Sequence, residues 1–194
     1  DAGSRLGWGA QITMRIAQRL YENGYITYMR TDSINLSEQA LKAARAAATA
    51  LYGKDHVYET ARLYQGKSKN AQEAHEAIRP AGDIFKTPGE LAPELSRDEF
   101  ALYDLIWKRT VASQMADAKL ERTTIKISGD KIERLFVAKG EVIKFDGFLT
   151  LYTEGKDDIE EEEDGMLPDL KKGNKMLSEE IIAIERFSYH PPRY

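Results

Sequence analysis

The segment GYITYMRTDSINLS, residues 24–37, gathers side chains that could act together on a substrate. Within six positions it holds Tyr28, Arg30, Thr31, Asp32 and Ser33, directly after an amphipathic helical pattern. An ordinary connection between two helices does not need so many groups that donate, accept or carry charge. The segment is therefore the first candidate for chemistry in this chain.

A nucleophilic Tyr28 would need a cation nearby. A phenol has a pKa near 10, so only about one in a thousand is ionised at neutral pH. Arg30 lies two positions later and shares a face with Tyr28 if the segment is extended. A guanidinium matches the oxygens of a phosphate, and phosphoryl transfer depends mainly on positioning and charge stabilisation. Asp32 could orient a neighbouring donor, and Thr31 and Ser33 could donate hydrogen bonds to phosphates.

The spacing Tyr-x-Arg is by itself a weak signal. The chain has 10 tyrosines, and most of them must be structural. On spacing alone, packing in the core or a turn leading into the next helix is the favoured explanation of Tyr28, ahead of catalysis.

Helices are predicted on both sides of this segment. Residues 9–24 carry Ile12, Ile16 and Leu20 at helical spacing, with Gly24 suited to the residue just past the end. Residues 35–53 form the clearest helix, capped by Ser37 and ended by Gly53, with one face made of Leu41, Ala44, Ala48 and Leu51. Ser96 and Glu99 form a capping box that opens a third helix. Its predicted buried side is Phe100, Tyr103, Trp107, Val111 and Met115.

The pattern changes to strands after about residue 116. Residues 123–128 alternate with period two, 131–152 suggest strands separated by glycine, and 179–190 suggest a last strand. Residues 54–95 are predicted to be irregular. The expected fold class is α+β, with helices first, strands second and a border near 115–120. The acidic run DDIEEEED, residues 157–164, is a solvated loop or, alternatively, a metal or partner site.

Composition limits the function only loosely. The 42% hydrophobic and 31% charged residues are ordinary for a globular protein, and the absence of cysteine excludes disulfides and thiolate metal sites. No apolar run is long enough to span a membrane, so cytoplasm is the expected compartment. The net charge of -4 hides an asymmetry: residues 1–115 hold 15 basic and 14 acidic side chains, and residues 116–194 hold 13 and 18. A local basic surface in the first part is compatible with these numbers.

Two long motifs, which occur in the same order as in a known protein family, indicate a resemblance to that family. The segment GYITYMRTDSINLS and the stretch AQEAHEAIRP, residues 71–80, resemble two signatures of the type IA DNA topoisomerases. Flanking sequence resembles the same family, including residues 102–115 and the terminal PPRY. The resemblance implies a helical domain similar to winged-helix or catabolite-activator-like folds over residues 1–116. It implies part of a β-rich arch over 117–194, with an acidic loop at 156–165.

The resemblance also implies roles for individual residues. Tyr28 matches the nucleophile that joins the 5′-phosphate of one DNA strand, and Arg30 matches the arginine on the scissile phosphate. His75 matches a histidine near the DNA-binding face, with Asp32 as its hydrogen-bond partner. Arg79 binds DNA or only pairs with a carboxylate, and Arg193 contacts phosphate or only caps the domain. Ser33 completes the predicted DNA-binding set.

Other aromatic and histidine side chains receive simpler expectations. Phe100, Tyr103, Trp107 and Trp8 could stack on bases, although helical spacing favours core packing for the first three. His56 and His190 are expected to be ordinary surface residues.

The family relaxes underwound DNA without ATP, acting on its single-stranded segments, and the expected parent is a monomer. Its Mg²⁺ is held by an upstream Toprim domain that has no counterpart here, so no cofactor is expected in this chain. Both ends suggest a piece of a longer protein, and we expect that piece alone to lack relaxation activity. The alternative is a non-catalytic helix-turn-helix module for DNA binding or interaction, built from residues 9–53. A reverse gyrase is a less favoured parent.

Overall fold

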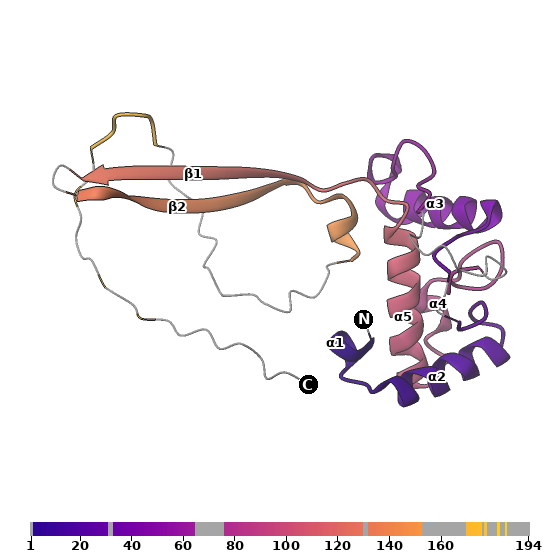
Figure 1. Cartoon of the computed structure of the whole chain (residues 1–194). Coiled ribbons are helices and arrows are strands. Elements are labelled where there is room, and N and C mark those ends of the chain that lie inside the picture. Colours follow the sequence, from indigo (N-terminus) through magenta and orange to yellow (C-terminus); the bar gives the residue numbers. More distant parts are fainter. Residues whose placement is uncertain are drawn as a thin grey trace.

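The protein is described by a computed structural model that covers residues 2–30, 33–64, 76–129, 132–152, 170–175, 177, 182 and 185. The described residues form a helical body from which a long two-stranded ribbon extends (Figure 1). The elements in chain order are α1 Ala2–Leu6, α2 Ala10–Glu22, α3 Glu38–Tyr52, η1 Lys54–His56, α4 Pro88–Leu91, α5 Arg97–Ala112, β1 Lys119–Gly129, β2 Ile132–Phe145 and η2 Gly147–Thr150. The α+β class expected from the sequence is confirmed.

Helix α5 is the centre of the body, and α1, α2, α3 and α4 all contact it (Figure 1). Leu20 from α2 and Ala44 from α3 are fully buried, and Trp107 from α5 is 3% exposed. Tyr103 is also buried, and its hydroxyl donates to the carbonyl of Lys86 at 2.7 Å. Trp107 and Tyr103 therefore belong to the core rather than to a base-stacking surface.

The predicted helix ends are confirmed where they depend on local chemistry. Ser37 caps α3 by accepting a hydrogen bond from Ala40 N, and Ser96 and Glu99 form the capping box of α5. Gly24 has a φ of 76°, the left-handed conformation that a residue with a Cβ adopts only under strain. The short helices α1 and α4 and the turn η1 were not anticipated, although 54–95 is otherwise irregular.

Two apolar positions of the predicted helical faces are exposed. Ile12 is 44% exposed and Leu51 is 51% exposed, whereas the residues one turn further into each helix are buried. The apolar face of each helix therefore extends beyond the part of the helix that other elements cover. Phe100 is half-buried rather than buried.

His56 is also not an ordinary surface residue. Its ring lies 4.8 Å from that of Phe145, and its Nε2 is 3.2 Å from Asp146 Oδ1. The histidine therefore joins the helical body to the end of β2. His190 lies outside the described residues.

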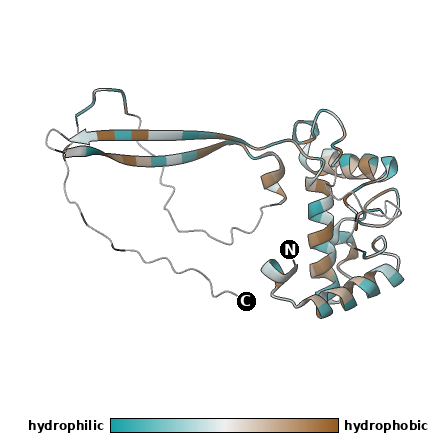
Figure 2. Cartoon of the chain, viewed as in Figure 1, coloured by the Kyte–Doolittle hydropathy of each residue, from teal (hydrophilic) through white to brown (hydrophobic). Residues whose placement is uncertain are grey.

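The ribbon differs from the expectation of several strands separated by glycine. β2 continues through Gly140, which pairs with Thr123 of β1 in one antiparallel ladder. The sequence after Phe145 then forms η2 instead of a strand, since Gly147 has a φ of 52° and Phe148 N donates to Ala116 O. Figure 2 shows apolar residues distributed along both strands.

Three expectations are not tested by the described residues. The acidic loop at 156–165 lies outside them, as does the predicted strand at 179–190 apart from Ile182 and Glu185. The border between 116 and 117 falls in the interval between α5 and β1 and stays a prediction.

Candidate active site around Tyr28

The segment that carries Tyr28 follows α2 directly and is attached to the helical body by backbone and side-chain contacts. Tyr25 N donates to Leu20 O at 2.9 Å, and Ile26, which is 2% exposed, forms an isolated antiparallel bridge with Pro80. Three positions after Ile26, Met29 packs against the core from a partly buried position. The backbone on both sides of Tyr28 is therefore attached to the helical body.

Tyr28 itself is exposed. Its side chain is 43% exposed, and its ring meets that of Tyr21 edge to face, with centroids 5.2 Å apart and an interplanar angle of 70°. Arg30 is also exposed, whereas Met29 between them is half-buried. A rigid segment thus presents a phenol and a guanidinium two positions apart at the surface.

Tyr25 is the informative contrast, because it lies three residues earlier on the same segment. Its hydroxyl donates to Glu94 Oε2 at 3.0 Å, and this hydrogen bond raises the pKa of the phenol. Burial raises the pKa of Tyr103 well above its ordinary value. Both phenols are thereby disfavoured as nucleophiles, since the phenolate is the reactive form.

The second motif lies directly beside the first. Thr27 N donates to Arg79 O, and Ala81 N donates to Tyr25 O, each at 2.9 Å. Segments about fifty positions apart in the chain thus run together next to Tyr28. The spacing within each motif could not have shown this contact, since it is long-range.

Arg79 is buried, at 9% exposure, and its side chain points into the protein. Its Nε and Nη2 donate to the two carboxylate oxygens of Glu76, both at 2.9 Å. Its Nη1 donates to the carbonyls of Pro80 and Gly82. Of the two roles left open by the sequence, the structure shows the carboxylate pair, and a DNA contact of Arg79 stays a prediction.

The remaining predicted site residues are only partly described. Ser33 is half-buried, and its Oγ accepts a hydrogen bond from Asn35 N at 3.2 Å. Asp32, His75 and Arg193 lie outside the described residues, so their roles stay predictions. Thr27 and Glu76 were missed, although both stand inside the two motifs.

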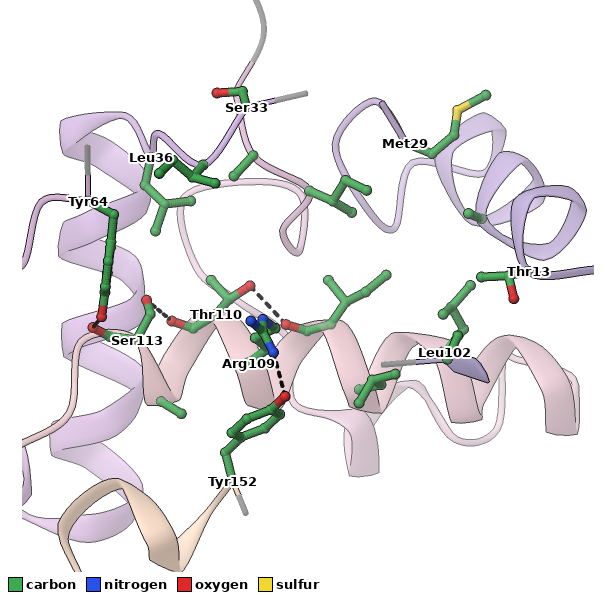
Figure 3. A pocket seen from close by; sticks show the side chains of 18 of the residues that line it. Thr13, Met29, Ser33, Leu36, Tyr64, Leu102, Arg109, Thr110, Ser113 and Tyr152 are labelled. Atoms are coloured by element: carbon green, nitrogen blue, oxygen red, sulfur yellow. Dashed lines mark hydrogen bonds between the residues drawn. The ribbon is translucent and has the colours of Figure 1, made fainter. Parts of the chain in front are cut away.

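A cavity of about 700 Å³ is lined in part by Met29 and Ser33, which lie on the same segment as Tyr28 (Figure 3). Met29, Ser33 and Leu36 line one side, and Leu102 and Thr110 of α5 line another. Most lining side chains are apolar, and neither Tyr28 nor Arg30 is among them. Its lining also includes two arginines: Arg62 donates to Asp117 Oδ1 at 2.6 Å, and Arg109 donates to the Tyr152 hydroxyl (Figure 3). The cavity is therefore mainly apolar, and both of these cations hydrogen-bond within the chain.

The described part of the chain also holds neither a candidate metal cluster nor a helix that could span a membrane. There, no three histidine or carboxylate side chains lie together so that they could hold a metal ion. None of the described helices is long and apolar enough to cross a membrane.

Fold and site together define an α+β protein that presents an anchored, exposed tyrosine beside a second sequence motif, residues 71–80, of which residues 76–80 are described. The family model for DNA topoisomerase matches residues 1–194, and the chain belongs to this family, as a piece of the type IA kind. "DNA topoisomerase 1" of Streptomyces coelicolor is 52% identical over 200 residues, covering 100% of this chain and 21% of that protein. The protein of the same name from Mycolicibacterium smegmatis is 48% identical over 201 residues, covering 100% and 22%.

A solved structure agrees. The full-length topoisomerase I of Thermotoga maritima matches with a TM-score of 0.65 and 37% identity, covering 77% of this chain and 24% of that one. The chain thus spans about a fifth of the length of the curated relatives it matches.

Proposed function

We propose that the chain is the tyrosine-bearing part of an enzyme that cleaves one DNA strand, passes another strand through the gap and reseals the first. The single observation that carries this is the anchored and exposed Tyr28, with Arg30 exposed two positions later. A nucleophile that must reach a polynucleotide has to be accessible and held in place. Family membership supports the same assignment.

The proposed step is a transesterification. The Tyr28 oxygen forms a bond to phosphorus, the bond from phosphorus to the 3′-oxygen breaks, and the phenol proton is released while the 3′-oxygen gains one. Arg30 would stabilise the charge on the non-bridging oxygens. Because the phosphotyrosine ester keeps the energy of the broken bond, the 3′-hydroxyl can reverse the attack without ATP. Passage between the two steps relaxes negative supercoils.

The finer features of the parent belong to this proposal. Its substrate would be single-stranded segments of underwound DNA, and it would act as a cytoplasmic monomer. Mg²⁺ would be bound by residues outside this chain, in a Toprim domain. The helical body would be a winged-helix or catabolite-activator-like domain and the ribbon a part of the arch.

The test uses the parent enzyme with a labelled single-stranded oligonucleotide. We expect Tyr28→Phe to abolish the covalent adduct with the 5′-phosphate. Tyr25→Phe is the matched control, because its hydroxyl is engaged by Glu94, and it should retain adduct formation. An adduct that persists in Tyr28→Phe would refute the assignment.

Two further outcomes separate the related hypotheses. A parent that binds DNA but forms no adduct even with Tyr28 intact would support the non-catalytic binding module instead. For the isolated chain, supercoiled plasmid with Mg²⁺ should remain supercoiled. Relaxed topoisomers made by the purified chain would contradict its predicted inactivity.

A further inference from the structure

The segment Glu76–Ala81 holds the Tyr28 segment at points before and after the tyrosine. Before it, the Thr27 hydroxyl donates to Ala77 O and accepts from Arg79 N, both at 2.9 Å. After it, Ala77 N donates to Asn35 O at 2.8 Å. Tyr28 and Arg30 therefore lie on a stretch of chain that is fastened at both ends to one short segment.

The Glu76–Arg79 ion pair gives that segment its shape. Two parallel hydrogen bonds join the guanidinium to the carboxylate, and the Arg79 guanidinium carbon also lies 5.7 Å from the ring centroid of Phe85, which is buried. The side chain of Arg79 is 10% exposed and that of Glu76 is 25% exposed. Such a pair has a defined geometry, because both partners lose most of their contact with water and depend on each other.

The same carboxylate extends the connection to helix α3. Glu76 Oε1 accepts a hydrogen bond from Ser37 N at 2.8 Å, and Ser37 is the residue that caps α3. Burial opposes ionisation of Glu76, but the hydrogen bonds from Arg79 and Ser37 outweigh it and lower the pKa of the carboxyl. The carboxylate thus stays charged at neutral pH and links Arg79 to the start of α3.

We propose that Thr27, Glu76 and Arg79 are positioning residues for the attack by Tyr28, acting as a clamp on the segment that carries it. Thr27 fixes the residue next to the nucleophile, and the ion pair fixes the segment that holds Thr27. In-line attack on phosphorus is sensitive to displacements of about 1 Å, which can cost about a hundredfold in rate. This inference rests on the proposed function of Tyr28, and it assigns Arg79 to the nucleophile's support rather than to DNA phosphate.

The first experiment compares Thr27→Val with Thr27→Ser in the parent enzyme. Valine keeps the shape of threonine and removes the hydroxyl, whereas serine keeps the hydroxyl. At saturating oligonucleotide, we expect adduct formation to slow about 10- to 100-fold in Thr27→Val. Thr27→Ser should restore most of the rate, and the DNA Kd should change less than about twofold in both variants, because no phosphate contact is altered.

The second experiment compares Glu76→Gln with Asp104→Asn. Asp104 is a matched control because its side chain is also 25% exposed and forms an ion pair, with Lys108 at 2.7 Å. Slower adduct formation in Glu76→Gln but not in Asp104→Asn supports the clamp. This pair decides the question if Thr27→Val melts below the assay temperature.

Failure of the clamp and failure of the proposed function would give different results. Unchanged adduct rates in Thr27→Val and Glu76→Gln would overturn the clamp, as would a rise in Kd that accounts for the whole loss. An adduct that survives Tyr28→Phe refutes the proposed function itself, independently of these variants.

Discussion

The helical body and the ribbon differ in how far their apolar side chains are buried. In the body, four helices cover α5 and bury a continuous apolar core. In the ribbon, β1 and β2 pair only with each other among the described residues and leave many apolar side chains at the surface. These exposed residues are Leu120, Leu135, Phe136, Val137, Val142 and Ile143.

The difference between the two regions is consistent with the place of the proposed nucleophile in the helical body. A two-stranded ribbon is marginal by itself in water and cannot fix a side chain closely. The Tyr28 segment is instead held by the helical body and by Glu76–Ala81. We expect the apolar faces of the ribbon to be covered by strands of the parent, as the resemblance to the type IA fold predicts.

The largest effect should come from the centre of the body. Trp107→Ala should reduce the free energy of unfolding by about 3–5 kcal/mol, because it empties a large buried site. Trp107→Phe should cost less, since it keeps a ring and removes a buried N–H that has no acceptor among the described residues. Urea denaturation followed by circular dichroism measures both. A loss below about 1 kcal/mol for alanine would mean that the body is not organised around α5.

The second-largest loss of stability should come from a substitution at the junction between the helical body and the ribbon. A Cβ at Gly147 would lie 2.5 Å from Ala116 O and 2.7 Å from Asp117 C. The backbone φ of Gly147 is also positive. Gly147→Ala should therefore cost about 2–3 kcal/mol, because backbone must move to admit the methyl group. Gly89→Ala is the control, with no atom within 4 Å of the added Cβ. Equal melting temperatures for the two variants would show that this junction is loose.

Acid should weaken the body before it affects the ribbon. The pKa of Glu76 lies below its ordinary 4.5, so its stabilising contribution is present above that value and is lost as the pH falls through the folded pKa. Protonation should cost about 1–2 kcal/mol, since charged hydrogen bonds are lost. Thr87 and Ser96 similarly lower the pKa values of Glu90 and Glu99.

Glu76→Gln isolates the share of Glu76 in this pH dependence. Between pH 3 and pH 6, about the range of ordinary carboxyl titration, the free energy of unfolding should depend less on pH in Glu76→Gln than in the unsubstituted chain. Parallel curves would show that Glu76 does not contribute to the acid sensitivity of the body.

The smallest effect should come from the ribbon. Val137 is 51% exposed, so Val137→Thr should change the stability of the chain by less than about 0.5 kcal/mol. Thermal unfolding of the isolated chain measures it. A loss above about 1 kcal/mol would mean that the ribbon packs against something in the chain, and the contrast between the two regions would fail.

Sequence reasoning succeeded where neighbouring residues decide the outcome. The Ser37 cap, the Ser96–Glu99 capping box and the left-handed Gly24 each depend on a few adjacent positions, and all are present. It failed for Ile12 and Leu51, because periodicity shows which face of a helix is apolar but not how far another element covers it. It failed for Gly140, since the ladder with Thr123 outweighs the local tendency of glycine to interrupt a strand.

The sequence alone determined the long helices α2, α3 and α5, the Ser37 cap, the Ser96–Glu99 capping box and the two motifs that identify the family. These are properties of residues close together along the chain. Only the tertiary structure decided that Arg79 is buried against Glu76, and that Thr27 and Asn35 are both fastened to the same distant segment. The physical reason is that the contacts of Thr27 and Asn35 join distant positions of the chain, with a sequence separation of 52 for Thr27 and Arg79. The Glu76–Arg79 pair is local in sequence, but its burial depends on how the whole chain folds.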